Sequence, residues 1–177
     1  VSRAAVSVSL PARFLLVGAT NPCPCGQRGH GPCRCSEAQI ARYRRRLSGP
    51  LMDRFDLRLG VGPPDPAAVF DAPKGESSHQ VAERVAVARQ AALRRGVQAN
   101  RQLSGAALEE AAPLEAPAEA LLREQLERGR LTMRGAMRTR AVSLTLCDLL
   151  GGRPPLPATL LRQALLLRGG ESALVAP

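Results

Sequence analysis

Four cysteines lie close together as two C-x-C pairs, Cys23 with Cys25 and Cys33 with Cys35. Proline and glycine residues separate the pairs, so the loop formed by residues 23–35 can turn sharply. Four thiolates are the usual ligands of a closed structural zinc site. C-x-C is tighter than the commoner C-x-x-C spacing, and reduced unliganded thiols or a redox-active pair are the alternatives. We predict a structural Zn²⁺ site, in which His30 could replace one thiolate.

Asn21 directly follows an apolar run, residues 14–19. A polar residue after a buried strand lies where open α/β sheets bind their ligands. Its side-chain amide can both donate and accept, so it could hold a phosphate oxygen and a water molecule together. A simple Asn-Pro turn is the alternative interpretation.

Arg54 has an acid on either side, Asp53 and Asp56, within the segment SGPLMDRFDL at residues 48–57. An arginine held at a surface edge can reach into a neighbouring subunit and neutralise charge on a transferred phosphoryl group. The alternative is a local Asp–Arg surface pair, worth less than about 1 kcal/mol. The spacing of these residues does not decide between the two.

The elements that must position these side chains fall into two groups. Alternation and apolar runs predict strands near the N-terminus, and Ser36 is a candidate N-cap for a helix over 37–47. After the proline-rich residues 62–66 the pattern becomes helical, with a capping-box signature at Ser77 and Gln80 and a candidate cap at Thr132. The predicted strands are residues 6–10, 14–19 and 55–61, and the predicted later helices begin near 77, 117, 132 and 158.

Composition narrows the function further. Lys74 is the single lysine among 25 basic residues, and the net charge is +10. Such a surface could meet phosphates, although a coding bias towards arginine explains it equally well. Aromatic residues make up only 2%, which argues against a sugar-binding cleft or a base-stacking platform. Two arginine clusters stand out: Arg42, Arg44, Arg45 and Arg46, and then Arg134, Arg138 and Arg140.

The chain contains no apolar run of about 18 residues and no signal peptide. We therefore expect no membrane association and a cytoplasmic location, where a disulfide framework is disfavoured. Cys147 lies in an apolar helical stretch, so we predict that it is a core residue rather than a ligand. Because the chain does not begin with Met, we expect it to be a piece of a longer protein.

Taken in order, these motifs resemble the ComM/YifB family, AAA+ ATPases of the magnesium-chelatase-like group that are more distantly related to MCM helicases. The resemblance covers nearly the whole chain. The matching residues are Ser2-Arg3-Ala4, Pro11-Ala12-Arg13-Phe14, Asn21-Pro22-Cys23-Pro24-Cys25-Gly26, Arg42-Tyr43, Leu47-Ser48-Gly49-Pro50-Leu51, Asp53-Arg54-Phe55-Asp56-Leu57, Gly75-Glu76-Ser77-Ser78, Arg84-Val85, Ala88-Arg89 and Leu131-Thr132-Met133-Arg134.

The resemblance implies a role for three residues. Asn21 would be sensor 1, which positions the attacking water beside the γ-phosphate of ATP. Arg54 would be the arginine finger, presented to the ATP of the adjacent subunit. Arg134 would be sensor 2, which couples the position of the helical lid to the nucleotide state. From its own sequence context, Arg134 would be read as an ordinary solvated helical arginine.

The resemblance also implies an architecture. We expect an α/β remnant of an AAA+ core in residues 1–62, holding its C-terminal strands and the sensor 1 region. A linker at 63–75 and an all-α helical lid bundle at 76–177 would follow. The full protein would form a ring, expected to be a hexamer, and couple hydrolysis of ATP with Mg²⁺ to helicase or branch-migration work on DNA. A chelatase-type motor acting on a protein partner, and a non-catalytic zinc-bearing interaction module, are the alternatives.

The sequence departs from the family pattern in two places. It has no G-x-x-x-x-G-K-[ST] loop and no apolar strand ending in paired acids, so we expect no ATP hydrolysis by this chain alone. In addition, Leu144 stands where the family has an arginine, which puts any role of that helix face in doubt.

Overall fold

The chain forms two compact units, Val1–Arg46 and Leu47–Pro177. The computed structural model describes residues 2–3, 6–9, 14–29, 31–47, 49–66, 70 and 75–169. Each unit is described separately below.

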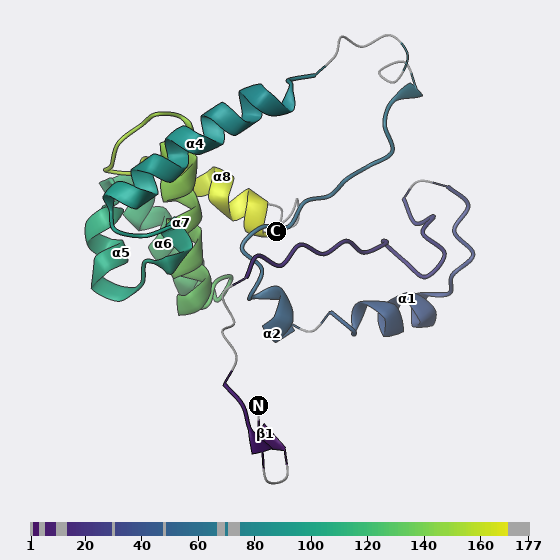
Figure 1. Cartoon of the computed structure of the whole chain (residues 1–177). Helices are drawn as coiled ribbons and strands as arrows, with labels where there is room; N and C mark the ends of the chain where they lie inside the picture. The colour runs from purple at the N-terminus through teal and green to yellow at the C-terminus, as the bar shows by residue number, and fades with distance from the viewer. Residues whose placement is uncertain are drawn as a thin grey trace. The chain divides into compact units, whose positions relative to one another are not determined.

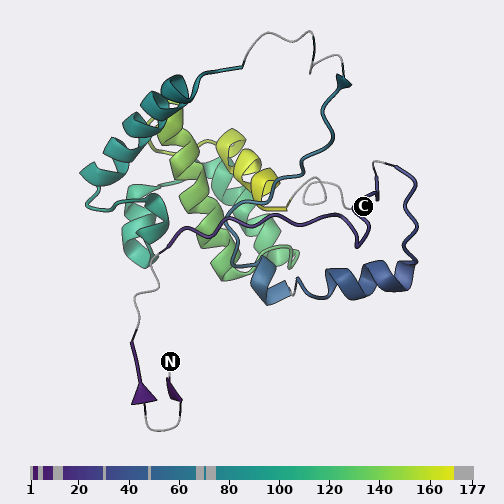
Figure 2. The ribbon, with the colours of Figure 1, turned by 45° about the vertical axis from the view of Figure 1, so that its right-hand side comes forward.

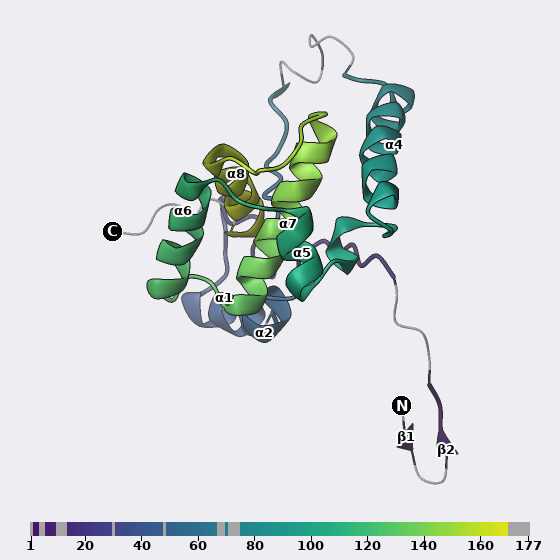
Figure 3. The same cartoon turned by 90° about the vertical axis from the view of Figure 1, so that its left-hand side faces the viewer.

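The second unit is a bundle of helices arranged around α7 (Figure 1). Helix α7 packs against α4, η1, α5, α6 and α8, and Figure 3 shows α6 and α8 on one side of it with α4 and α5 on the other. The view in Figure 2 shows the same order. The elements are α2 (Gly49–Met52), α4 (Ser78–Arg94), η1 (Asn100–Gln102), α5 (Gly105–Ala111), α6 (Ala116–Glu127), α7 (Met133–Leu149) and α8 (Ala158–Gly169).

The core of this bundle is built from leucine, alanine and one cysteine. Leu108, Leu144 and Leu156 are fully or almost fully buried in it, together with Cys147. The prediction that Cys147 is a core residue is therefore confirmed. Leu144 contributes its whole side chain to the core, so this face of α7 serves packing where the family pattern has an arginine.

Local sequence signals set where the helices begin. Ser77 caps α4, because its hydroxyl accepts from the Gln80 N–H at 3.3 Å while the Gln80 side chain accepts from the Ser77 N–H at 2.8 Å. Thr132 caps α7 by accepting from the Gly135 N–H at 2.9 Å. Both predicted caps are confirmed. Gly151, at a φ of +68°, ends the turn that follows α7.

A buried polar network joins α4, η1 and α7. The guanidinium of Arg95 donates to both carboxylate oxygens of Asp148, at 2.6 and 2.7 Å. Asn100 donates to the same carboxylate at 2.7 Å and to the Thr145 hydroxyl at 3.1 Å. Burial of the Asp148 carboxylate is therefore offset by three charge-assisted hydrogen bonds.

The first unit contains little regular structure in its described residues. Strands β1 (Ser2–Arg3) and β2 (Val6–Ser7) form a short antiparallel pair, with Ser2 opposite Ser7. Helix α1 (Glu37–Arg44) begins after Ser36, the predicted N-cap, which forms a capping box with Gln39, and ends three residues before the predicted limit of 47. The Thr20 hydroxyl lies 2.9 Å from the hydroxyl of Tyr43, which ties the approach to the cysteine loop to α1.

The predicted strands at 14–19 and 55–61 are not strands in this structure. Both segments are irregular, and the α/β remnant expected for 1–62 is therefore not shown. A strand needs a neighbour to satisfy its backbone groups, and the described residues offer neither segment a partner strand. The apolar side chains remain in the open as a result: Phe14 is 64% exposed and Val17 81%. What the structure does show is a mostly helical chain with a helical C-terminal domain.

None of the helices in the described ranges combines the length and the apolar character needed to cross a lipid bilayer.

Candidate functional site

A hollow of about 750 Å³ opens on the surface of the helical unit, and five arginines line it. Asp53 is the one acid among the described residues that surround it. Five guanidinium groups around a single carboxylate create a strongly positive site, which suits a polyphosphate better than any neutral ligand. We call this site the arginine hollow, and its arginines are Arg54, Arg58, Arg130, Arg134 and Arg168.

Arg54 stands just after α2, on a segment that the helical bundle holds in place. The Arg54 guanidinium donates to the Pro50 carbonyl at 2.6 Å, while its side chain stays exposed. Arg138, on α7, pairs with the Asp56 carboxylate and donates to the Arg54 carbonyl at 2.9 Å. The backbone that follows Arg54 is thereby tied to α7.

Arg168, near the end of α8, holds the same segment from a buried position. It donates to the Phe55 carbonyl at 2.9 Å, and its guanidinium lies 3.8 Å from the Asp53 carboxylate. Its Nε is buried without a hydrogen-bond partner among the described residues, and so is the Nε of Arg58. Burial lowers the pKa of Arg168, although the nearby carboxylates of Asp56 and Asp53 oppose that shift. Unpaired buried donors beside a hollow are a reason to look for an anionic ligand.

Arg134 lies in the first turn of α7, and the cap of that helix brings it to Asp53. The Thr132 hydroxyl lies 3.2 Å from a carboxylate oxygen of Asp53, 79 residues away in sequence. Gly135 allows this approach, because a β-carbon there would come within 3.3 Å of the Thr132 hydroxyl and 3.5 Å of Asp53. Among the described residues the exposed Arg134 side chain has no ion-pair or hydrogen-bond partner, so it is free to meet a ligand. The structure therefore brings Arg54 and Arg134 to one site.

Asn21 belongs to the first unit and is described only within it. Its side chain is exposed and lies against the cysteine loop, since a β-carbon on Gly26 would be 3.7 Å from Asn21 Nδ2. The roles of Asn21, Arg54 and Arg134 in hydrolysis remain predictions.

The four loop cysteines converge on one point. Their sulfur atoms all lie within 4.8 Å of one another. Cys23 Sγ is 3.4 Å from Cys25 Sγ and 3.7 Å from Cys33 Sγ, and all four thiols are free. The cluster is compatible with a Cys₄ metal site, as the sequence predicts, whereas His30 lies outside the described residues.

Backbone groups of the loop stabilise a negative charge on these sulfurs. N–H groups of Gln27 and Arg34 lower the pKa of the Cys25 thiol to about 6. The backbone N–H of Cys25 acts in the same direction on Cys35, but the neighbouring thiols and burial outweigh it and raise the pKa of Cys35 to about 12. Without a bound cation, the cluster thus resists the loss of all four protons.

Sequence reasoning did not single out Arg58, Arg130 or Arg168 as site residues. They come from three separate segments, so no spacing in the sequence could have grouped them. The predicted basic cluster Arg134, Arg138 and Arg140 also divides in the structure. Arg138 pairs with Asp56, and Arg140 donates to the Ala112 carbonyl at 2.7 Å, so only Arg134 of the three is exposed.

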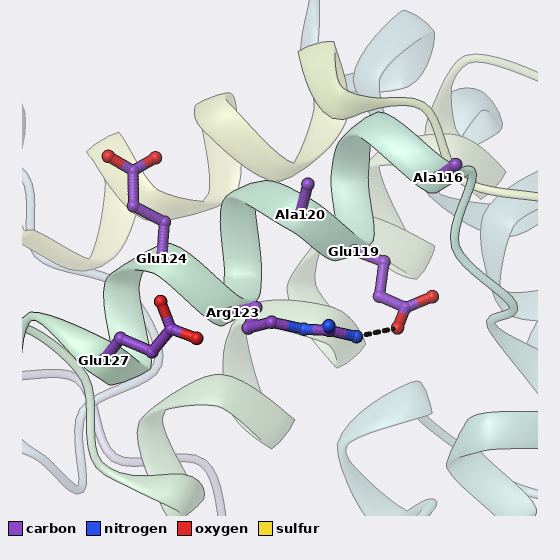
Figure 4. Close-up of a pocket in the computed structure, with 6 residues that line it drawn as sticks. All are labelled: Ala116, Glu119, Ala120, Arg123, Glu124 and Glu127. Carbon is purple, nitrogen blue, oxygen red and sulfur yellow. Dashed lines mark hydrogen bonds and ion pairs between the residues drawn. The ribbon is translucent and has the colours of Figure 1, made fainter.

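A second hollow, of about 340 Å³, lies along the outer face of α6 (Figure 4). Every residue that lines it comes from that one helix, and three of them are glutamates. Glu119 pairs with Arg123 one turn later, at 2.7 Å. We interpret this face as an ordinary solvated helix surface.

Two family models match consecutive parts of the chain. The family model described as magnesium chelatase, subunit ChlI, matches residues 1–69, and that of the ChlI C-terminal region matches residues 75–168. Helices α4 to α8 thus lie in the part matched to the ChlI C-terminal region, whereas Arg54 and Arg58 of the arginine hollow lie in the part matched by the first model. The chain belongs to the magnesium chelatase ChlI family.

Three relatives show the extent of the similarity. The chain is 44% identical over 149 residues to an uncharacterized protein of Mycobacterium tuberculosis, which covers 82% of this chain and 29% of the relative. It is 37% identical over 152 residues to the competence protein ComM of Haemophilus influenzae, covering 85% and 30%. It is 35% identical over 150 residues to the uncharacterized protein YifB of Escherichia coli, covering 84% and 30%. The chain therefore spans less than a third of the length of these relatives.

Proposed function

We propose that this chain is the C-terminal portion of a ring-forming AAA+ ATPase that couples ATP hydrolysis to helicase or branch-migration work on DNA, in recombination or natural transformation. The observation that carries the proposal is the arginine hollow. Arg54 and Arg134, matched separately to an arginine finger and to sensor 2, line one positive site. A competence protein among the relatives supports the biological setting.

The chemistry of phosphoryl transfer explains why such a site would be useful. Negative charge spreads over the oxygens of the transferred group, and positioned cations stabilise it in the transition state. Because Arg54 and Arg134 share one hollow, both would be presented to the same phosphates, those of the adjacent subunit in a ring. Asn21, in the first unit, would be the residue that positions an attacking water.

The phosphate-binding loop and the residues that bind Mg²⁺ would lie outside these 177 residues. The sequence has no G-x-x-x-x-G-K-[ST] loop and no apolar strand ending in paired acids, so we derive no step through the metal from this chain. The exposed apolar segment at 14–17 supports a larger core. Leu15 is 84% exposed, and burying this run in a sheet would give it the neighbours it lacks.

Contact with DNA would come through exposed arginines of the first unit. Arg42, Arg44, Arg45 and Arg46 lie on or just after α1, and all four side chains are exposed. Arginines without interleaved aromatic residues suit the phosphate backbone rather than the bases. A protein partner of the chelatase type is the competing proposal, supported by the family to which the chain belongs.

The test uses the full-length protein that carries this chain and measures ATP turnover. Arg54→Ala should lower kcat by about 10³-fold or more while nucleotide binding stays close to normal. Arg123→Ala is the matched control, because Arg123 is an exposed arginine on α6 with a local pair, and it should leave turnover unchanged. Loss of nucleotide binding in Arg54→Ala would instead assign Arg54 a structural role.

Mixed rings test whether Arg54 acts on the neighbouring subunit. Subunits with Arg54→Ala should regain turnover when they are mixed with subunits that carry an inactivating change in the phosphate-gripping loop. Some interfaces of such rings join an intact loop to an intact Arg54. No recovery in rings shown to be mixed would contradict action in trans. Turnover stimulated by DNA supports the DNA motor, and turnover stimulated only by a partner protein replaces it with the chelatase-type motor.

A further inference from the structure

The spacing of the four loop sulfurs matches a tetrahedral metal site. Four sulfurs placed about 2.3 Å from a central Zn²⁺ lie about 3.8 Å from one another. Three pairs in the cluster are 3.4, 3.7 and 3.7 Å apart. A disulfide would need about 2.0 Å, so these contacts are not bonded pairs. The geometry is close to that of a Zn–S₄ centre, and a small expansion would accommodate the ion.

The donor set also fits a structural ion. Four cysteines fill a tetrahedral shell and leave no open position for substrate or water. Cys23 is fully buried, while Cys25, Cys33 and Cys35 are more accessible, so the ion has a route of entry. The described residues of the surrounding loop form no helix or strand that would otherwise hold it. A bound ion would provide that constraint.

The same loop holds Asn21. The Gly26 N–H donates to the Cys23 carbonyl at 3.0 Å and closes a tight turn, in which Gly26 has a φ of +78°. The Asn21 side chain lies against Gly26. Two of the four sulfurs, those of Cys23 and Cys25, belong to the turn, so whatever fixes the sulfurs also fixes the surface on which Asn21 lies.

We propose that Cys23, Cys25, Cys33 and Cys35 bind one structural Zn²⁺ ion and that this ion sets the position of the Asn21 side chain. The metal site stands on the loop geometry by itself, and only the value of Asn21 for hydrolysis rests on the function proposed above. The cysteines are positioning residues, which act on the reaction through Asn21.

Metal content of the reduced 177-residue chain tests the site. Purified in the presence of zinc, the chain and a Cys147→Ala variant should each contain one zinc ion per chain. A Cys25→Ser/Cys33→Ser variant should contain none. Cys147 is the matched control, because it is a reduced cysteine in the other unit. Substoichiometric zinc in the parent chain, zinc retained by the double variant, or iron in place of zinc would each overturn the assignment.

Cobalt provides an independent reading of the ligand geometry. Co²⁺ added to the metal-free chain should produce the intense visible bands of a tetrahedral thiolate complex, and Zn²⁺ should then displace it. Weak octahedral bands would show that the four sulfurs do not share one ion.

The position of Asn21 is read without ATP. In ¹⁵N spectra of the zinc-loaded chain, removing the zinc with a chelator should shift the side-chain amide signals of Asn21. The Asn21→Gln variant identifies these signals. Those of Asn100 should stay in place, because Asn100 is held in the bundle by Asp148 and Thr145. Unmoved Asn21 signals would overturn the positioning claim. Equal movement of the Asn21 and Asn100 signals would also overturn it, because zinc would then affect the whole chain and not only the loop. Neither result depends on the ATPase, whose own test is Arg54→Ala.

Discussion

The pair Arg95 and Asp148 should be the most sensitive polar contact of the helical unit. The Asp148 side chain is 2% exposed and that of Arg95 is 20% exposed. Removing one partner of a buried ion pair leaves the other charge uncompensated, at a cost of about 3–5 kcal/mol. Arg95→Ala leaves the more deeply buried charge, that of the Asp148 carboxylate, without its partner, so we expect the loss of stability to fall within that range.

The reverse substitution should cost less. Asp148→Ala leaves a guanidinium that still reaches solvent and still donates to the Asn100 side chain at 3.1 Å, so we expect about 2–3 kcal/mol. For a unit of this size, that corresponds to a fall in Tm of about 10 °C. Replacing both residues together, as Arg95→Met with Asp148→Leu, should recover most of the loss, because neither charge remains buried alone.

Urea unfolding of the 177-residue chain, followed by far-UV circular dichroism, measures these costs, since most of the helix belongs to the bundle. Glu119→Ala is the matched control: it breaks an exposed ion pair on α6 and should cost under about 0.5 kcal/mol. If Arg95→Ala and Asp148→Ala cost no more than Glu119→Ala, the network is not the buried anchor that its geometry indicates. If the double variant is the least stable of all, the cost of the single substitutions does not come from a buried charge left without its partner.

Four further outcomes follow from the structure. Leu144→Arg, which introduces the residue of the family pattern at a fully buried position, should cost at least about 4 kcal/mol in the same urea assay; a mild effect would contradict the core assignment. Asp56→Ala should speed hydrogen exchange of the Arg58 N–H, which donates to the Leu167 carbonyl at 2.6 Å, by about fivefold, with the amides of α4 unchanged as the control. Hydrogen bonds from Arg84 hold the pKa of Glu76 below its ordinary value of 4.5. This pair should therefore stabilise the start of α4 above pH 4.5, and that stabilisation should be lost as the pH falls through the lower pKa of the folded state. An NMR titration of Glu76 should show the lowered pKa, and Arg84→Ala should abolish the shift. The 177-residue chain alone should give no ATP turnover, and measurable turnover that co-purifies with it would contradict that expectation.

Helix starts were predictable from the sequence because their causes are local. Ser36, Ser77 and Thr132 each accept from a backbone N–H three residues later, and such a contact depends only on residue type and spacing. The strands at 14–19 and 55–61 failed for the opposite reason. An apolar run is suited to a strand, but the ladder partner that makes it one must come from elsewhere in the fold.

The candidate site was predictable in part. Resemblance to a family identified Arg54 and Arg134, but the convergence of Arg58, Arg130 and Arg168 on them is a tertiary fact. Arg138 is another example, because the sequence grouped it with exposed arginines, whereas in the structure it forms an ion pair with Asp56.

The two units hold their candidate site residues by different means, and α7 makes the difference testable. Asn21 depends on a turn within its own loop, so its placement should survive damage to the bundle. Arg134 lies at one end of α7 and Asp148 at the other, with the core residue Leu144 between them. Loss of the Asp148 network should therefore disperse the arginine hollow by loosening the helix that carries both Arg134 and the Arg138 anchor of the Arg54 segment. Variants at Asp148 should then impair the arginine hollow, and variants at the cysteines should impair the placement of Asn21.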